Sequence, residues 1–173
     1  MASDTRMKMD AALLSDLNDQ LNYERFSAEK YCSIAVQLDS INLSGLAAFM
    51  HKREGEERSH AHKFMEYMTD RGASPILTMI PDPEVNLRNL TVFTIGIEAF
   101  RTALEHEKSV TARINALYDA AEQSDDGQTC VFLHWFLSEQ TEEERSLDLI
   151  ITKFILADGN GAAILMLDKE LGS

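Results

Sequence analysis

The sequence contains few of the residues that cross-link, kink or interrupt a chain. Among 173 residues there are two cysteines, three prolines, eight glycines and one tryptophan. Cys32 and Cys130 lie far apart in segments of helical character, with the spacing of neither a metal knuckle nor a disulfide framework. We therefore expect both to be free thiols in a reducing cytoplasm, and a fold that packing stabilises.

Basic residues and long hydrophobic runs are also scarce. The chain has 16 basic against 29 acidic residues, a formal charge of -13, and this disfavours a nucleic-acid partner because phosphate binding requires a basic face. No apolar run approaches the ~20 residues that span a bilayer, and residues 1–10 lack the apolar run of a secretory signal. We expect a cytoplasmic protein without membrane or nucleic-acid partners, and its natural counterparts are cations or cationic partners.

The chain does contain apolar residues at helical spacing in four long segments. Its length fits one domain, residues 1–173, with a core that needs no metal or disulfide for stability. We expect helices over about 10–38, 44–70, 90–123 and from the turn at 124–127 to about 157, then a short amphipathic segment at 162–171. Ser44 is the expected N-cap of the second helix, and Gly72 follows its end.

All three prolines fall in residues 71–87, between the second and third helices. This segment is too long for a local turn, and its apolar residues, Ile76, Leu77, Met79, Ile80 and Val85, favour a packed crossover over a polar linker. The sequence therefore predicts an all-α fold. It is an antiparallel four-helix bundle with a long crossover between the second and third helices and a short fifth C-terminal helix.

Polar residues interrupt the apolar stripe of each long helix near its middle. Residues 53–60 of the second helix place Arg53, Glu57 and His60 in line with leucine, methionine and phenylalanine. The other interruptions are Glu24 in the first helix, Glu107 in the third, and Gln140 and Glu143 in the fourth. Mid-height positions of a bundle meet, so these groups should converge.

A converging set of carboxylates carries excess negative charge that bound cations would relieve. Oxygen ligands with one imidazole suit iron, manganese or zinc, and a bridging carboxylate suits a pair of metals. The alternative for each glutamate alone is a boundary residue that reaches solvent. The remaining histidines are expected at the surface or behind the ligands, because they do not share the carboxylate stripes: His51, His62, His106 and His134.

At these residues the sequence resembles the bacterial non-haem ferritins, prokaryotic members of the ferritin-like diiron superfamily. The resemblance runs from about Leu13 to Leu171. The stretches that carry it are Leu21-Asn22-Tyr23-Glu24, Glu56-Glu57-Arg58-Ser59-His60, Glu105-His106-Glu107, Phe132-Leu133-His134-Trp135, Ser138-Glu139-Gln140-Thr141-Glu142-Glu143-Glu144 and Leu167-Asp168-Lys169-Glu170-Leu171.

The resemblance implies the roles of individual residues. One iron would be held by Glu24, Glu57 and His60, and a second by Glu57 as a bridge with Glu107 and Gln140. Tyr31 matches the tyrosine beside the diiron centre, where it can supply an electron. A third iron position would use Glu56, Glu139, Glu142 and Glu143, with help from Gln140.

The resemblance also implies an activity and an assembly. The implied activity is that of a ferroxidase, which oxidises Fe²⁺ with O₂ or H₂O₂. The implied assembly is a homo-oligomeric cage of twenty-four subunits, inside which ferric oxide mineral is deposited. Bacterioferritins carry a haem-ligating methionine where this chain has Arg58, so we expect no haem. Two other functions stay open: a diiron oxidase or peroxidase without mineral storage, and a structural helical bundle without metal.

Overall fold

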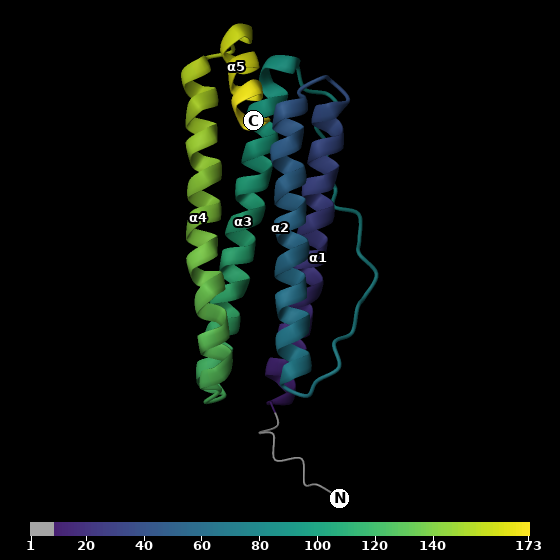
Figure 1. Ribbon diagram of the computed structural model, residues 1–173, viewed down its shortest axis with the longest axis vertical. Helices are drawn as coiled ribbons and strands as arrows, with labels where there is room; N and C mark the ends of the chain where they lie inside the picture. Colours follow the sequence, from purple (N-terminus) through teal and green to yellow (C-terminus); the bar gives the residue numbers. More distant parts are fainter. Residues whose placement is uncertain (1–8) are drawn as a thin grey trace, which may run out of the picture.

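The computed structural model describes residues 9–173, and this part of the chain contains five helices. They are α1 (Ala11–Asp39), α2 (Ser44–Asp70), α3 (Val92–Gln123), α4 (Gly127–Ala157) and α5 (Gly161–Leu171). Figure 1 shows the first four side by side along the long axis, with α5 packed at one end. The predicted all-α bundle with a fifth helix is confirmed, and its boundaries differ from the expected ones by one or two residues at most.

The crossover between α2 and α3 runs the length of the bundle. α2 ends at the lower end in Figure 1 and α3 begins at the upper end, so α1 and α2 are antiparallel, α3 and α4 are antiparallel, and α2 and α3 run in the same direction. Over residues 9–173, none of these helices has the length and apolar character that a bilayer crossing requires.

The crossover is held to α1 mainly by hydrogen bonds, whereas the sequence suggested apolar packing. Asn18 and Asn22 both donate through Nδ2 to the Ile76 carbonyl, at 3.1 and 2.8 Å. The side chains of Ile76, Leu77 and Met79 are 67%, 53% and 93% exposed. The expectation of a packed crossover therefore holds only near its end, because the amides of α1 bind its backbone and turn these apolar side chains outward.

The start of α2 is capped from a distant part of the chain. Leu43 occupies the N-cap position without a side-chain hydrogen bond, and the predicted cap Ser44 is the first helical residue. Instead, Asp168 of α5 accepts a hydrogen bond from the Leu46 amide at 2.9 Å. A Cβ at Gly45 would lie 1.7 Å from the Asp168 carbonyl oxygen, so this close approach requires glycine.

Two apolar clusters fill the bundle, one toward each end. The cluster toward α5 includes Leu38, Met50, Phe100 and Phe154. The cluster toward the opposite end includes Leu17, Phe64, Ile114 and Phe136. Phe93 is 55% exposed because it lies in the first turn of α3, at the end of the bundle. The space between the two clusters is polar.

Candidate metal centre

A belt of six buried polar side chains separates the two apolar clusters. On each of the four long helices these residues fall in sequence between members of one cluster and members of the other. These six side chains therefore lie at the same height along the bundle, as the sequence suggested. The polar belt consists of Glu24 (α1), Glu57 and His60 (α2), Glu107 (α3), and Gln140 and Glu143 (α4).

The half of the polar belt contributed by α1 and α2 contains oxygen atoms without partners. His60 Nδ1 lies 3.6 Å from Glu57 Oε1 and 4.0 Å from Glu24 Oε2, and one donor atom from each of the three residues lies within 4.8 Å of the others. Among the residues that the structure describes, none gives a hydrogen bond to Glu24 Oε2 or to either oxygen of Glu57. Buried carboxylate oxygens in this state require protons or cations.

Burial and mutual repulsion act on both carboxyl groups of this half. The pKa of Glu24 lies well above its ordinary value, first because of desolvation and next because of the charge of Glu57. The pKa of Glu57 is also raised well above its ordinary value by desolvation, and the charge of Glu107 adds to this effect. A multivalent cation between these groups would replace the missing solvation and screen the repulsion. Hard oxygen donors with one imidazole are a donor set that iron accepts.

The half of the polar belt contributed by α3 and α4 has polar partners of its own. Glu107 accepts a hydrogen bond from the Tyr31 hydroxyl at 2.6 Å through Oε1, and one from Gln140 Nε2 at 2.9 Å through Oε2. Burial raises the pKa of Glu107, and these two hydrogen bonds oppose that rise because they stabilise the ionised form. Glu107 and Gln140 are therefore ordered without an added ion.

Arg53 supplies a positive charge to the same half of the polar belt from α2. Its Nη1 forms a close ion pair with Glu143, which is 1% exposed, and lies 3.0 Å from Glu56 Oε2. Burial raises the pKa of Glu143 to about 7, and the Arg53 charge opposes the shift. The helical spacing predicts that Arg53 lies on the buried stripe, but it indicates no partner for this residue.

The residues expected at a third cation position are only partly brought together. Donor atoms of His60, Glu139 and Glu143 lie within 4.8 Å of one another. Glu56 is linked to this group because Arg53 pairs with both Glu56 and Glu143. Glu142 is exposed and belongs to neither of the donor groups found along the polar belt.

A hydrogen-bonded chain that was not predicted from the sequence lies behind Glu24. Arg113 Nε donates to Gln20 Oε1 at 2.8 Å, and Gln20 Nε2 donates to Glu24 Oε1, also at 2.8 Å. Gln20 is 2% exposed and lies one helical turn before Glu24, and this spacing was the available signal. The chain fixes one oxygen of Glu24 and leaves Oε2 directed toward His60.

His106 is the one histidine outside the polar belt that the fold buries. It accepts or donates a hydrogen bond with the Ser27 hydroxyl at 2.7 Å and stacks on the Tyr23 ring. Burial lowers the pKa of His106 to about 4, so the ring is neutral at physiological pH. It therefore supports the packing of α1 against α3 and lies behind Glu107.

Comparisons with known proteins agree with this architecture. The Ferritin-like domain family matches residues 14–157. A bacterial non-heme ferritin of Staphylococcus aureus (strain USA300) is 34% identical over 161 residues, 93% of each chain. A protein of the same name from Escherichia coli O6:H1 is 32% identical over 161 residues, which cover 93% of this chain and 94% of its own.

Solved structures give the same result. A novel open pore ferritin from the archaeon Archaeoglobus fulgidus matches with a TM-score of 0.89 at 35% identity, over 95% of this chain and 97% of that one. A closed form of that ferritin, engineered by site-directed mutagenesis, matches with a TM-score of 0.88 at 36% identity, over 95% of this chain and 96% of its own.

Proposed function

The chain belongs to the ferritin family of iron-storage proteins, and we propose that it oxidises Fe²⁺ at the polar belt and stores the product as a ferric mineral. The observation that carries the proposal is the group of unpartnered carboxylate oxygens on Glu24 and Glu57 beside His60. The guanidinium of Arg53, which pairs with the polar belt, binds Glu143 and Glu56 instead. A divalent cation is the ligand that this arrangement favours.

Two Fe²⁺ ions can share the polar belt as substrates. We assign the first to Glu24, Glu57 and His60, whose donor atoms are already within 4.8 Å of one another. We assign the second to Glu57, Glu107 and Gln140, with Glu57 as the bridge because both of its oxygens are free of hydrogen bonds from the described residues. Binding of the second ion requires the Gln140 side chain to present its amide oxygen, since Nε2 now donates to Glu107.

The donor set favours oxidation of the bound ions. Carboxylates stabilise Fe³⁺ more than Fe²⁺ because the interaction grows with the charge of the ion, and this lowers the potential of the couple. Two Fe²⁺ supply the two electrons that convert O₂ and two protons to H₂O₂, or H₂O₂ and two protons to two waters. Tyr31, hydrogen-bonded to Glu107, is the side chain placed to supply a further electron.

A third iron position forms part of the proposal, with Glu56, Glu139, Glu142 and Glu143 as ligands. The cluster of His60, Glu139 and Glu143 donors supports it. Arg53 must leave Glu143 before a cation binds there, because the two would occupy the same place. Iron bound at this position is expected to be the weakest held of the three.

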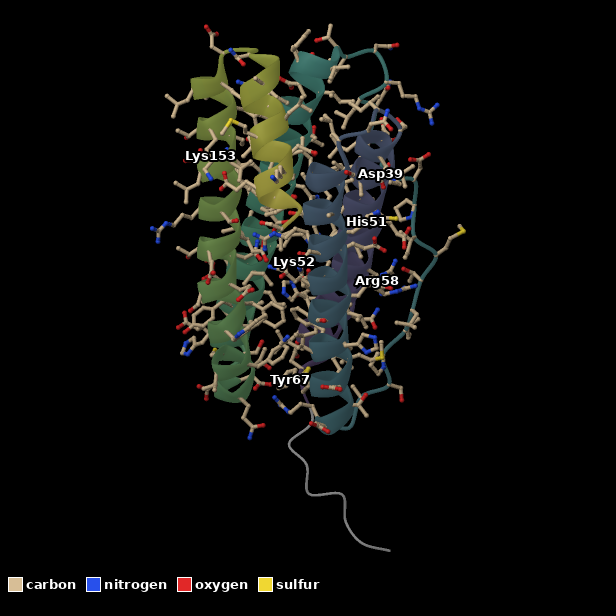
Figure 2. All side chains as sticks on the ribbon, turned by 45° about the horizontal axis from the view of Figure 1, so that its top comes forward. Asp39, His51, Lys52, Arg58, Tyr67 and Lys153 are labelled. Carbon is tan, nitrogen blue, oxygen red and sulfur yellow. The ribbon has the colours of Figure 1, made fainter. Side chains whose placement is uncertain are left out.

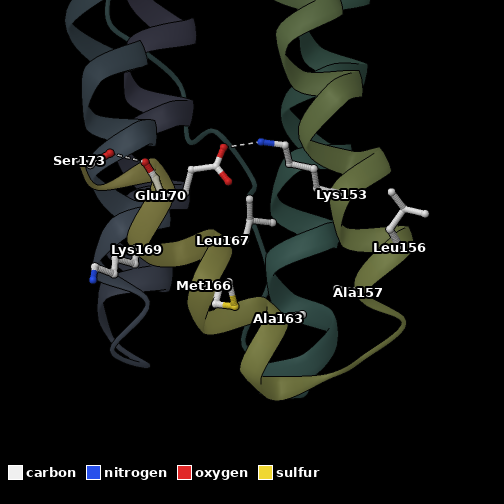
Figure 3. Close-up of a pocket in the computed structure, with 9 residues that line it drawn as sticks. All are labelled: Lys153, Leu156, Ala157, Ala163, Met166, Leu167, Lys169, Glu170 and Ser173. Atoms are coloured by element: carbon white, nitrogen blue, oxygen red, sulfur yellow. Dashed lines mark hydrogen bonds and ion pairs between the residues drawn. The ribbon is translucent and has the colours of Figure 1, made fainter.

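Assembly into a cage of twenty-four subunits completes the storage function that we propose. Apolar side chains are exposed along the crossover, as described above, and around the end of α4 and α5. Figure 3 shows the second surface, where Leu156, Ala163 and Met166 line a pocket between the end of α4 and α5. Leu156 and Met166 are 79% and 74% exposed in the single chain, which supports burial against other copies.

Anaerobic titration with Fe²⁺, followed by rapid mixing with O₂, tests the centre. The wild type should bind at least two Fe²⁺ per chain tightly, and Glu57→Ala should lose the bridge and slow initial oxidation by about 100-fold. Glu66→Ala, an exposed glutamate on the same helix, is the matched control and should oxidise iron at the wild-type rate. Equal rates for Glu57→Ala and wild type would reject the proposal.

Aerobic loading separates storage from oxidation alone. A storage protein should elute as a large assembly that retains many irons per chain after gel filtration, whereas an oxidase without storage should release its product and elute as a small oligomer. Electron microscopy of the loaded fraction would show whether the particle is a cage. It would also distinguish closed walls from the open pores of the Archaeoglobus fulgidus relative.

A further inference from the structure

A second group of metal-ligating side chains lies on the outer side of α1 and α2, away from the polar belt. Cys32 of α1 and His51 and Glu54 of α2 offer donor atoms that all lie within 4.8 Å of one another. In Figure 2, Asp39 at the end of α1 and His51 and Arg58 of α2 follow one another on the side nearer the crossover, and Lys52 lies on the other side of α2. Cys32 also lines a groove between α1 and the crossover.

The neighbours of this group hold Glu54 and His51 in orientations that suit a metal. Arg58 donates two hydrogen bonds to Glu54 Oε1, at 2.8 and 3.3 Å. The other oxygen, Oε2, lies 3.0 Å from His51 Nδ1. His51 Nε2 faces Asp39 Oδ2 at 3.8 Å, which is beyond hydrogen-bond distance but on the side where a metal-bound histidine commonly has an outer carboxylate.

We propose that Cys32, His51 and Glu54 form a binding site for a borderline-soft divalent cation of the Zn²⁺ class. The ligands would be Cys32 Sγ, His51 Nδ1 and Glu54 Oε2, with water in a fourth position. Ligand atoms of a tetrahedral zinc site lie about 3.4 to 3.6 Å apart. The donor atoms of Cys32, His51 and Glu54 already lie within 4.8 Å of one another. Side-chain rotation is therefore enough to give them the spacing of a zinc site.

Binding replaces protons by the metal. The thiol of Cys32 gives up its proton to solvent as the Zn–S bond forms, and the cation takes the place of the proton shared by His51 Nδ1 and Glu54 Oε2. Around the site, Glu29, Asp39 and Glu54 with the new thiolate carry four negative charges against the one positive charge of Arg58. A dication therefore reduces the local charge without reversing it.

The donor atoms separate this site from the polar belt. A thiolate prefers zinc-class ions, whereas the polar belt offers carboxylates, an amide and one imidazole, which suit iron. The two sites are expected to sort cations by softness, and the outer site needs no part of the proposed iron chemistry to exist.

Titration with Co²⁺, a spectroscopic substitute for Zn²⁺, tests the site in the assembled protein. We use Glu57→Ala as the background, since it removes the bridge of the inner centre and leaves the outer donors intact. This protein should bind Co²⁺ with a thiolate-to-metal charge-transfer band in the near ultraviolet. Adding Cys32→Ser should abolish the band and weaken binding of this ion by more than about tenfold. Cys130→Ser is the matched control, because it removes the other thiol from α4, and the band should remain.

His51→Ala gives an independent result should the cysteine variant fold poorly. It keeps both thiols, and it should lose the same band while Zn²⁺ no longer protects Cys32 from a thiol reagent. The proposal is overturned if no charge-transfer band forms, if the band survives Cys32→Ser or His51→Ala, or if Cys130→Ser removes it. Failure of the inner iron centre would leave all of these results unchanged, so the two proposals are tested separately.

Discussion

The two halves of the polar belt are equally buried but differ in what compensates their charge. On the α1–α2 side, Glu57 has neither oxygen hydrogen-bonded within the described residues, and Glu24 has one oxygen free. On the α3–α4 side, Glu107 has a partner for each oxygen and Glu143 pairs with Arg53. Within the described residues, the α1–α2 half therefore holds its carboxylates without a cationic partner, whereas in the α3–α4 half Glu107 is hydrogen-bonded and Glu143 relies on the ion pair with Arg53 because no described residue hydrogen-bonds its oxygens.

This difference explains how a bundle can be folded before it is loaded. A belt of carboxylates without any partner would oppose folding by several kcal/mol, whereas a fully paired belt would leave no room for an ion. The hydrogen bonds of Tyr31, Gln140 and Gln20 order the ligands, and only a few oxygens remain for the cation. Substitutions that exchange the properties of the two halves test this difference.

Arg53→Ala should have the largest effect, because it removes the internal cation of the α3–α4 half. The metal-free variant should unfold with a free energy lower by about 3 to 5 kcal/mol, since Glu143 loses its buried partner. The same change should add one divalent cation per chain in anaerobic Fe²⁺ titration, because the place beside Glu143 becomes vacant.

Lys52→Ala is the matched control for that experiment. Lys52 is adjacent in sequence and 75% exposed, and it reaches only Glu56, at 3.7 Å. Its removal should change neither the stability nor the number of bound ions by a measurable amount. If Arg53→Ala binds no more metal than Lys52→Ala, then Arg53 does not occupy the third position.

The stability of the metal-free protein should depend on pH because Glu143 of the polar belt titrates. Glu143 has a pKa of about 7 in the folded chain against an ordinary 4.5, so the folded state holds a proton that the unfolded state releases. Stability from this group is complete below about pH 4.5 and falls as pH rises to about 7, by on the order of 3 kcal/mol. His106, with its pKa lowered to about 4, contributes in the opposite direction between about pH 4 and 6.5.

The measurement is therefore the difference between wild type and Glu143→Gln in urea unfolding with chelator, from about pH 5 to about pH 8. The His106 contribution cancels in this difference. We expect wild type to lose stability relative to the variant as pH rises. A difference that stays constant or moves the other way would show that Arg53 keeps Glu143 ionised throughout.

Two isosteric substitutions compare the halves directly. Glu57→Gln replaces a buried carboxyl group, which must hold a proton or an unstabilised charge, by a neutral amide, so the metal-free protein should gain about 1 to 2 kcal/mol. Glu107→Gln places an amide where two donors now point, so stability should fall by about 1 to 2 kcal/mol. Thermal unfolding at one protein concentration, with chelator present, gives both values. Stability changes of the same sign would contradict the difference in hydrogen bonding between Glu57 and Glu107.

Sequence periodicity predicted the helices and the polar belt because both follow from residues close in the chain. The three-and-four spacing locates each stripe, and the position of Glu24, Glu57 or Glu107 within its stripe gives the height. Antiparallel neighbours with short connections then bring these heights together. The resemblance supplied the roles of Tyr31 and Gln140, which spacing alone did not provide.

Interactions between distant segments were not predictable in the same way. Asp168 caps α2 from 122 residues away, and no local pattern distinguishes it from any other aspartate. The pairing of Arg53 with Glu143 depends on the rotation of α2 against α4. Exposure of the crossover side chains arises because Asn18 and Asn22 bind its backbone. Gly55 is exposed and a Cβ there would meet no described atom within 4 Å, so packing gives no reason for it.

Tyr31→Phe tests a single hydrogen bond within the α3–α4 half. It removes the hydrogen bond from the Tyr31 hydroxyl to Glu107 and keeps the ring, while Gln140 still donates to the other oxygen. The metal-free protein should lose about 1 to 2 kcal/mol, because a bond to a carboxylate is stronger than one between neutral groups. Tyr23→Phe on the same helix is the control, since its hydroxyl bonds only to the Ser109 hydroxyl at 2.8 Å and its loss should cost about 1 kcal/mol or less. Thermal unfolding of the two variants with chelator measures the difference, and equal costs would mean that Glu107 is not held as an ionised carboxylate by its partners.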